Sequence, residues 1–404
     1  MTYSFILGKN PNLSLVEILA VLEALKIDCR PVFIGEQVFL ADFSKGVDLE
    51  ALIKRLGGTI KVGRIISIIQ KELKVEQLAE VFEETDKKVF FGFSYYSLGA
   101  ESVTFKNLWR QNKVFGMELK KILKEKYRVS LRWVLSQEQT LSSVIVAKNK
   151  LLTQGKELNF FVDQDKIYLG ETVAVQDFEE YGLLDFGRPN RDDKSGMLPP
   201  KLAKMMLNLA QAKFDEVILD PFCGSGTILQ EAILMGYQKV VGCDNSVKAI
   251  EDTQVNLDWL NQKYPEKNIK AEVFVADAKE ISREIEVHSI NVIVTEPYLG
   301  PAKFKDSQID EIVFELKNLY LKSLEEFYKI LKPGGRVVMV SPVWRIGNQL
   351  RYLPIVEQIK KLGFTQIDFS DFKIEAENQS RSGLIYQRES QKVIREIFVW
   401  EKKN

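Results

Sequence analysis

Residues 220–227, DPFCGSGT, decide the fold of this 404-residue chain. They follow an apolar strand candidate at 217–219 and open a helical pattern over 228–235 that ends at Gly236. Gly224 and Gly226 allow a sharp turn and a close approach of the backbone to a ligand. The N–H groups that begin the next helix point to the same place. Strand, glycine loop and helix in this order predict a binding site for a nucleotide or a nucleoside.

The loop departs from the dinucleotide-binding fingerprint, because Leu229 stands where the third glycine belongs. This departure disfavours a nicotinamide or flavin cofactor. Asp220 opens the loop, and a carboxylate suits a ligand with an ammonium group better than it suits a pyrophosphate. S-adenosylmethionine carries such an ammonium group.

Strand and helix patterns alternate from Met197 onward, which predicts a parallel sheet with helices on both faces. The strand candidates lie at 217–219, 240–243, 273–275, 292–294, 337–340, 366–369 and 397–400. Asp220, Asp244 and Asp277 follow the first three of them. One such aspartate is typical of a helix cap, but three at successive strand ends predict a nucleoside site. Asp244 would then bind the ribose and Asp277 the adenine amino group.

The fourth strand ends in the sequence TEPYLG, residues 295–300. A tight turn here would present an acceptor side chain and backbone carbonyls to an exocyclic amino group. Tyr298 would offer a face on which a flipped base stacks. The alternative interpretation is a plain strand-to-helix loop that contains a buried tyrosine.

These motifs resemble those of a known family. DPFCGSGT, GCD at 242–244 and EPY at 296–298 resemble class I, Rossmann-like methyltransferases that use S-adenosylmethionine. Residues 181–210 (YGLLDFGRPNRDDKSGMLPPKLAKMMLNLA), with the amino-terminal half, resemble THUMP-domain tRNA guanosine-N2 methyltransferases that act at tRNA position 10. The resemblance implies an α/β fold, with a mostly parallel seven-stranded Rossmann-like sheet at 191–404. It also implies an α+β ferredoxin-like and THUMP RNA-binding region at 1–165 and a linker at 166–190.

The resemblance also implies roles for individual residues. The methyl donor would bind residues of the glycine loop and of the next two strand ends: Asp220, Pro221, Cys223, Gly224, Gly226, Thr227, Asp244, Asn245, Asp277 and Ala278. The catalytic turn would be Thr295, Glu296, Pro297 and Tyr298. The family turn normally reads Asp or Asn followed by Pro-Pro-Tyr, so Thr295 replaces a carboxylate or an amide. Either Thr295 or Glu296, through its side chain or its carbonyl, would face the amine.

The formal net charge is zero, with 56 basic and 56 acidic side chains, but the charge is unevenly placed. Residues 101–156 hold 12 basic and 4 acidic side chains, whereas residues 157–186 hold one lysine and eight carboxylates. A helix predicted over 106–127 places Lys113, Lys120 and Lys124 on one face, and a strand predicted over 144–147 leads to Lys148 and Lys150. These lysines form either a solvated face or an RNA-binding surface that contacts phosphates.

Some classes of chemistry are disfavoured by composition. Cys29, Cys223 and Cys243 are far apart without pair spacing, which argues against disulfides and against a zinc site. One histidine, His288, excludes chemistry that needs several imidazoles. The absence of a long apolar run or a signal-peptide pattern predicts a cytoplasmic protein without a membrane partner. The sequence assigns no partner subunit.

The expected function is therefore methyl transfer from S-adenosylmethionine to an exocyclic amino group of a tRNA base, with guanosine N2 as the leading target. One alternative is methylation of adenine N6 or cytosine N4 in RNA or DNA. Another is an RNA-binding homologue whose catalysis is impaired by Thr295 and Glu296. A cysteine nucleophile is disfavoured because the turn contains no cysteine.

Overall fold

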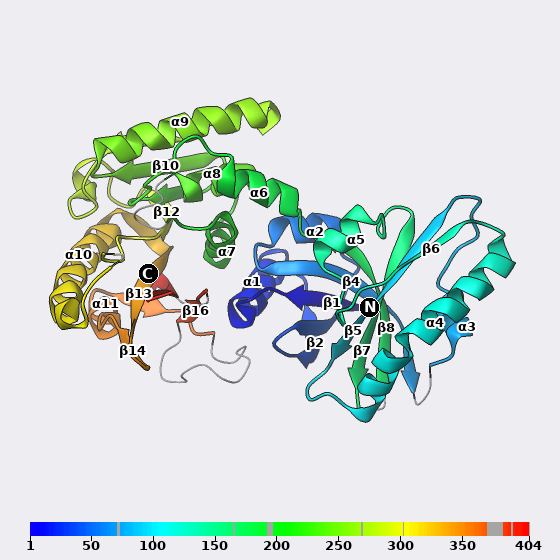
Figure 1. Cartoon of the computed structure of the whole chain (residues 1–404). Coiled ribbons are helices and arrows are strands. Elements are labelled where there is room, and N and C mark those ends of the chain that lie inside the picture. The colour runs from blue at the N-terminus through cyan, green and yellow to red at the C-terminus, as the bar shows by residue number, and fades with distance from the viewer. Residues whose placement is uncertain are drawn as a thin grey trace. The chain divides into compact units, whose positions relative to one another are not determined.

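The computed structural model describes residues 1–70, 73–164, 166–191, 197–267, 270–301, 303–369, 383–388 and 391–403. The chain forms two compact units, each assembled from separate segments (Figure 1). The first unit comprises Met1–Pro11, Leu25–Arg55 and Thr59–Phe178. The second comprises Asn12–Ala24, Leu56–Gly58 and Glu179–Asn404.

The first unit is built on an eight-stranded sheet with the order β2-β3-β1-β4-β8-β7-β5-β6. Its strand pairs are antiparallel except that β5 runs parallel to β6 and β7. The strands are β1 (Thr2–Leu7), β2 (Cys29–Ile34), β3 (Val38–Phe43), β4 (Thr59–Gln70), β5 (Val89–Ser97), β6 (Leu131–Val134), β7 (Gly155–Asp163) and β8 (Lys166–Val175). Its helices include α2 (Leu49–Arg55), α3 (Val75–Ala79), α4 (Val103–Tyr127) and α5 (Ser143–Lys148).

Two segments of the first unit differ from the sequence-based expectation. Residues 144–147, expected as a strand, lie in the helix α5, which begins because the Ser142 hydroxyl accepts a hydrogen bond from the Ile145 N–H at 3.2 Å. The segment expected as a linker from residue 166 begins instead with strand β8. This strand forms a hairpin with β7 and also pairs with β4, so its backbone hydrogen bonds are made within the sheet.

The second unit contains the predicted mostly parallel sheet. Seven strands follow the order β11-β10-β9-β12-β13-β17-β15, and β17 runs antiparallel to both neighbours on this path. Two short strands lie off the path, β14 against β13 and β16 against β17. The strands are β9 (Val217–Asp220), β10 (Lys239–Asp244), β11 (Glu272–Val275), β12 (Ile290–Thr295), β13 (Leu331–Ile346), β14 (Gln349–Tyr352), β15 (Phe364–Gln366), β16 (Leu384–Tyr386) and β17 (Val393–Lys402).

Helices cover both faces of this second sheet because its buried strands alternate their side chains between two apolar clusters. Ile218 and Val292 face one cluster, which also contains residues of α1 (Pro11–Ala24), α7 (Pro200–Ala210), α8 (Thr227–Leu234) and α9 (Val247–Lys263). Leu219 and Ile293 face the other, with α10 (Ile309–Ile330) and α11 (Val356–Lys361). A short helix α6 (Phe178–Phe186) precedes α7 in the chain. The alternation is the pattern expected of a sheet buried on both sides.

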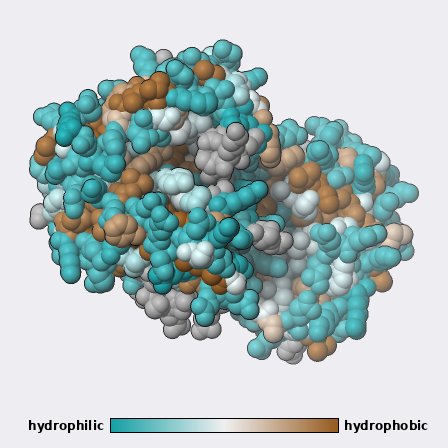
Figure 2. Space-filling model, turned by 60° about the vertical axis from the view of Figure 1, so that its left-hand side comes forward, coloured by the Kyte–Doolittle hydropathy of each residue, from teal (hydrophilic) through white to brown (hydrophobic). Residues whose placement is uncertain are grey.

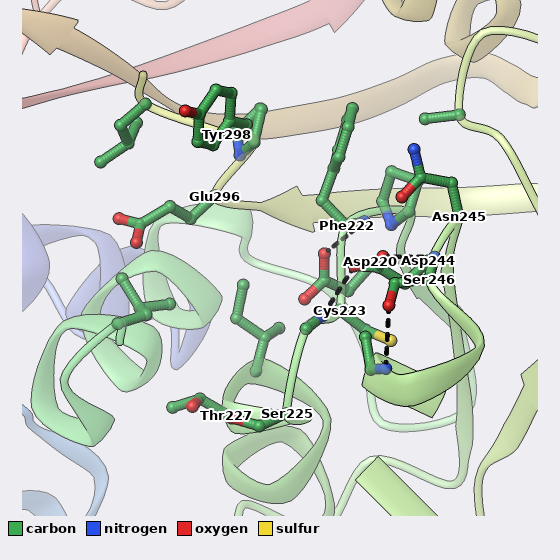
Figure 3. A pocket seen from close by; sticks show the side chains of 18 of the residues that line it. Asp220, Phe222, Cys223, Ser225, Thr227, Asp244, Asn245, Ser246, Glu296 and Tyr298 are labelled. Atoms are coloured by element: carbon green, nitrogen blue, oxygen red, sulfur yellow. Dashed lines mark hydrogen bonds between the residues drawn. The ribbon is translucent and has the colours of Figure 1, made fainter. Parts of the chain in front are cut away.

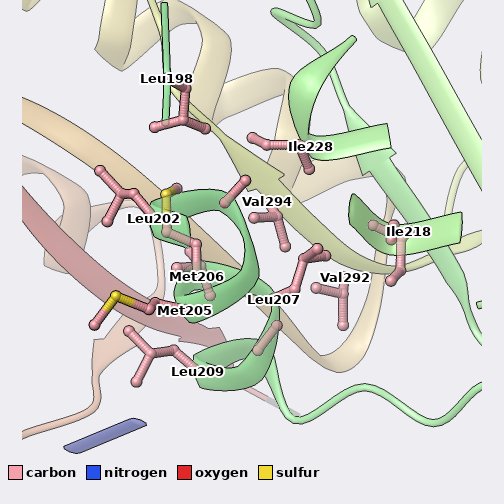
Figure 4. Close-up of a cluster of buried hydrophobic side chains, with 14 of the residues drawn as sticks. Leu198, Leu202, Met205, Met206, Leu207, Leu209, Ile218, Ile228, Val292 and Val294 are labelled. Atoms are coloured by element: carbon pink, nitrogen blue, oxygen red, sulfur yellow. The ribbon is translucent and has the colours of Figure 1, made fainter. Parts of the chain in front are cut away.

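Helix α7 is the centre of the first of these clusters (Figure 4). Its Leu202, Met206 and Leu207 are fully buried against the sheet residues Val292 and Val294. Burying such a side chain contributes about 1.5–3 kcal/mol. This packing fixes the strands whose carboxyl ends carry the loops described below.

Helix α1 lies on α7 although it is encoded near the start of the chain. Leu13, Val16 and Ala20 of α1 belong to the same apolar cluster as α7. The buried carboxylate of Glu17 accepts hydrogen bonds from Gly57 N and Gly58 N and from the Asn208 side chain, at 2.7–2.8 Å. Burial raises the pKa of Glu17 to about 7, against the lowering effect of these hydrogen bonds.

On the face seen in Figure 2, hydrophilic side chains cover most of the surface and apolar ones form scattered patches. Within the described residues, no helix has both the length and the apolar character needed to span a bilayer.

Candidate active site

A cavity of about 490 Å³ lies at the carboxyl ends of β9, β10, β11 and β12 in the second unit (Figure 3). Loops that follow these four strands supply most of its lining, which is where open α/β sheets bind ligands. Of the sequence-predicted site residues, most line it: Asp220, Pro221, Cys223, Gly224, Thr227, Asp244, Asn245, Asp277, Ala278, Glu296, Pro297 and Tyr298. Gly226 and Thr295 are not among the lining residues.

The glycine loop turns because two of its residues adopt left-handed backbone conformations. Gly224 has φ +53° and Gly226 has φ +83°, which disfavours any side chain at either position. At Gly226 an added Cβ would also lie 3.0 Å from Thr253. Gly226 is the N-cap of α8, so the first turn of that helix begins at Thr227, at the cavity wall.

Asp220 ends strand β9 and is almost completely buried. One of its carboxyl oxygens accepts hydrogen bonds from the Thr295 hydroxyl at 2.8 Å and from Phe222 N at 3.1 Å. Burial raises the pKa of Asp220 to about 7, and the negative charges of Asp244 and Glu296 act in the same direction. Asp220 therefore gains a proton near neutral pH and prefers a cationic ligand when it is ionised.

Asp244 connects the end of β10 to the glycine loop. Its two carboxylate oxygens accept hydrogen bonds from Gly224 N at 3.1 Å and from Ser246 N at 3.0 Å. Asp277 follows β11, accepts a hydrogen bond from Lys279 N at 2.9 Å, and pairs with the Lys279 ammonium at 3.2 Å. Each carboxylate keeps acceptor capacity for hydroxyl or amino groups of a ligand.

The turn after β12 divides its side chains between the interior and the cavity. Thr295 is fully buried, and its hydroxyl donates to Asp220. Glu296 lines the cavity and forms two hydrogen bonds with the guanidinium of Arg395, at 2.5 and 3.0 Å. The Tyr298 carbonyl accepts a hydrogen bond from the Tyr320 hydroxyl at 3.1 Å, while the Tyr298 side chain is 54 % exposed.

Two arginines contact these residues and were not predicted from the sequence. Arg188 is buried and donates to the Thr227 hydroxyl at 2.6 Å, which holds the start of α8 in place. Arg188 lies in the stretch 181–210, whose resemblance to a methyltransferase family was noted from the sequence, so the sequence did single out its region. Arg395 lies 99 residues beyond Glu296, in a strand with no local motif, and nothing in the sequence pairs the two.

The sequence-predicted RNA-binding lysines all lie in the first unit. Lys113 and Lys124 are exposed on α4 and Lys120 is half-buried, and the opposite side of this helix buries apolar residues such as Leu119. Lys148 and Lys150 are exposed at and just after the end of α5. The structure brings Lys113, Lys120 and Lys124 together on one helix.

Sequence comparison finds similarity to methyltransferases. Residues 188–345 match the family described as RMKL-like, methyltransferase domain, and residues 100–255 match a DNA methylase family. The chain is 35% identical over 180 residues to the tRNA (guanine(10)-N2)-dimethyltransferase of Methanothermobacter thermautotrophicus, covering 44% of this chain and 48% of that protein. It is 34% identical over 148 residues to the protein of that name in Methanocaldococcus jannaschii, which covers 36% of this chain and 38% of that protein. The matches thus span less than half the length of these two relatives.

A third relative is matched over most of its own length. The chain is 33% identical over 141 residues to the "probable tRNA (guanine(10)-N2)-dimethyltransferase" of Methanothermococcus thermolithotrophicus, covering 35% of this chain and 79% of that protein. Among solved structures, TrmN from Thermus thermophilus aligns over the whole of both chains, with a TM-score of 0.55 and 18% identity. The structure described as "SMU.472, a putative methyltransferase complexed with SAH" aligns over 100% of this chain and 98% of its own, with a TM-score of 0.50 and 12% identity. The two structures share the fold of this chain.

Proposed function

We propose that this chain transfers methyl groups from S-adenosylmethionine to the N2 amino group of guanosine in tRNA. The chain belongs to the class I tRNA methyltransferase family of the tRNA (guanine(10)-N2)-dimethyltransferases. The observation that carries the proposal is a single cavity that combines a glycine loop, strand-end carboxylates and the Glu296–Tyr298 turn. Such a cavity holds a nucleoside cofactor and presents hydrogen-bond acceptors to an amine.

The residues on one side of the cavity fit S-adenosylmethionine. We call them the cofactor side: residues 220–225, Thr227, Asp244, Asn245 and Asp277. Figure 3 labels Asp220, Asp244 and Asn245 among them. Asp220 supplies a carboxylate for the methionine ammonium, Asp244 supplies acceptors for the ribose hydroxyls, and Asp277 supplies an acceptor for the adenine amino group. When bound, the cofactor supplies an electrophilic methyl group on a sulfonium, which leaves as a neutral thioether.

The other side of the cavity, formed by Glu296, Pro297 and Tyr298, is the acceptor side. The Glu296 carboxylate accepts hydrogen bonds from the target amine and stabilises the positive charge that develops on its nitrogen during methyl transfer. The exposed ring of Tyr298 stacks on the flipped base, which holds the amine in place. Thr295 acts indirectly in this arrangement, because its hydroxyl is bound to Asp220.

The first unit supplies the tRNA-binding surface in this proposal. Lys113, Lys120 and Lys124 on α4, with Lys148 and Lys150, contact backbone phosphates, which provide most of the sequence-independent affinity of a nucleic-acid-binding protein. The range 1–165, predicted from the sequence as ferredoxin-like and THUMP, falls in this unit apart from Asn12–Ala24 and Leu56–Gly58. Since tRNA is the proposed substrate, we propose that the protein acts in the cytoplasm.

The proposal is tested by incubating the full chain with radiolabelled S-adenosylmethionine and unmodified tRNA, followed by digestion to nucleosides. We expect label in N2-methylated guanosine. Label in N6-methyladenosine or N4-methylcytidine would replace the proposed target with another amine, and an absence of label from every nucleoside would contradict the enzymatic function.

A further inference from the structure

We propose that the second unit carries an RNA-binding surface of its own, which contacts the phosphates on either side of the target nucleotide. Five exposed cationic side chains form this surface, and we call them the basic band: Lys303, Lys305, Arg345, Arg388 and Lys392. The inference rests on the proposed function, because an RNA strand is the partner that it names. It goes further because the phosphate contacts proposed above all lie in the first unit.

Contacts between separate segments hold the basic band together. Arg345, near the end of β13, donates its N–H to the Lys392 carbonyl at 2.9 Å. The Lys392 ammonium lies 5.7 Å from the centre of the Phe304 ring. Lys303 and Lys305 are the residues on either side of Phe304 in the chain. Four of the five cations are therefore neighbours, although the segments that carry them are far apart in the sequence.

The fifth cation, Arg388, connects the basic band to the acceptor side of the cavity. It follows β16, and its Nε donates to the Tyr386 hydroxyl at 3.3 Å. Tyr386 lies opposite Arg395 where β16 pairs with β17. Arg395 in turn forms two hydrogen bonds with the Glu296 carboxylate, which lines the cavity.

A second contact also places the basic band beside the turn that follows β12. Trp344 precedes Arg345 in β13, and a Cβ added to Gly300 would lie 4.0 Å from the Trp344 Nε1 atom. Gly300 is two residues after Tyr298, whose exposed side chain belongs to the acceptor side. Both ends of this turn therefore contact strands that lead directly to the basic band.

Nearby carboxylates do not cancel the charge of the basic band. Two other arginines of these segments are already paired, Arg351 with Asp310 at 3.2 Å and Arg395 with Glu296. Among the residues that the structure describes, no ion pair involves a cation of the basic band. Asp306 is the one acidic residue within the described segments that carry the basic band: 303–308, 344–352, 383–388 and 391–395. The surface is therefore strongly cationic.

Phosphate groups suit exposed lysines and arginines at this position. A base that leaves its helix to enter a cavity brings its ribose with it, so the phosphates on either side stay close to the entrance. Lysine and arginine contacts with such phosphates position the strand without reading its sequence. An acidic protein would also suit the charge, but the position beside the acceptor side favours the RNA strand that delivers the base.

The first test replaces Lys303, Lys305 and Lys392 by Glu in one variant. Its affinity for unmodified tRNA, measured by filter binding, should fall about 30-fold at low salt. The slope of log K against log salt concentration should become shallower by about 2, because three phosphate contacts are lost. The affinity for S-adenosylmethionine, measured by calorimetry, should stay the same, which together with thermal melting shows that the variant is folded.

The matched control replaces three exposed lysines at the other end of the same sheet, Lys213, Lys239 and Lys263, by Glu. They lie where β9 and β10 begin and where α9 ends, whereas the cavity lies at the carboxyl ends of the strands. This variant should bind tRNA as the natural chain does. A second variant, with Gln at the three positions of the basic band, avoids charge reversal and should show the same change of slope with a loss of about tenfold.

The second test asks whether the phosphates beside the target nucleotide are the groups that are bound. The probe is a pentanucleotide with guanosine at its centre, made with natural phosphates or with uncharged methylphosphonates on both sides of the guanosine. The natural chain should bind the charged probe about tenfold more tightly than the uncharged one. The variant with Glu at Lys303, Lys305 and Lys392 should not prefer the charged probe, since the interaction is absent in both cases.

The outcomes separate this inference from the proposed function. If the natural chain methylates guanosine N2 but folded variants of the basic band keep its tRNA affinity, salt slope and probe preference, the inference alone fails. Equal losses in the variant and its control would also overturn it, because the attraction would then be general. If the natural chain binds tRNA through the basic band but labels no guanosine, the proposed function alone fails. If it binds no RNA, both fail.

Discussion

The cofactor side and the acceptor side of the cavity differ in how far apart in the sequence their interacting residues lie. On the cofactor side, Asp244 holds Gly224, 20 residues away, and Ser246, two residues away. On the acceptor side, Glu296 pairs with Arg395 across 99 residues. The hydrogen bond between Thr295 and Asp220, which connects the two sides, spans 75 residues. A strand, its loop and the next strand suffice for the first side, whereas the second requires the completed sheet.

The largest expected effect tests the cofactor side. Asp244→Ala removes the proposed ribose acceptor and also the group that holds Gly224 N and Ser246 N. We expect the affinity for S-adenosylmethionine, measured by calorimetry, to fall by about 100-fold or more. Asp252→Ala, which removes a partly exposed carboxylate of α9 that pairs with Lys248, is the control and should bind normally. An unchanged affinity of Asp244→Ala would show that the ribose binds elsewhere.

The second prediction concerns tRNA binding by the first unit, which should change without any change in cofactor binding at the cavity. Replacing Lys113, Lys120 and Lys124 by Glu should weaken tRNA binding by about 30-fold at low salt and reduce its salt dependence, while cofactor affinity stays the same. The matched control reverses three other exposed lysines of the first unit, Lys9, Lys45 and Lys87. Equal losses in filter binding for the two triple variants would contradict a specific basic face on α4.

A smaller effect comes from the proton on Asp220, whose pKa is raised to about 7 in the ligand-free protein. Below that pH the carboxyl is mostly neutral, and above it the carboxylate attracts the cationic cofactor. Affinity should therefore rise about tenfold between pH 6 and pH 8, with protons released on binding. Calorimetry in buffers of different ionisation enthalpy measures both quantities. If the affinity of the natural chain does not change with pH, as we expect for Asp220→Asn, then Asp220 does not bind the ammonium group of the cofactor.

The same raised pKa predicts the direction of the stability change. The folded protein holds the Asp220 proton more tightly than the unfolded chain, whose aspartates have a pKa near about 4. Its contribution to stability is therefore fully present below about pH 4 and is lost as the pH rises through about 7. Melting of Asp220→Asn should lack this component between pH 5 and 8.

The smallest effect tests the link between the two sides. Thr295→Val removes the hydroxyl that donates to Asp220, and that hydrogen bond lowers the pKa of Asp220. Its loss should leave less Asp220 ionised at pH 7 and weaken cofactor binding about threefold, with recovery above pH 8. Thr295→Ser keeps the hydroxyl and should bind as the natural chain does. A loss that persists at high pH would indicate disturbed packing instead.

The same contrast explains how much could be predicted from the sequence. The alternation of strands and helices along the second unit and the residues after β9, β10 and β11 follow from local patterns, because a strand, a glycine and a carboxylate lie within a few residues of one another. The direction of the Thr295 side chain and the partner of Glu296 depend on strands that are far apart in the sequence and become neighbours only in the folded sheet. Residues 144–147 were wrongly predicted as a strand, because a β-branched run outweighed the Ser142 cap that begins α5.

Helix α1 has a consequence for dissecting this protein. Three separate segments form the compact unit that carries the cavity. They are Asn12–Ala24, Leu56–Gly58 and the chain after Phe178. A fragment cut at residue 191 would uncover the apolar surface of α7 and remove Glu17 from the Asn208 side chain. An engineer who wants the catalytic half alone therefore needs a circular permutant, or α1 supplied as a separate peptide, rather than a truncation.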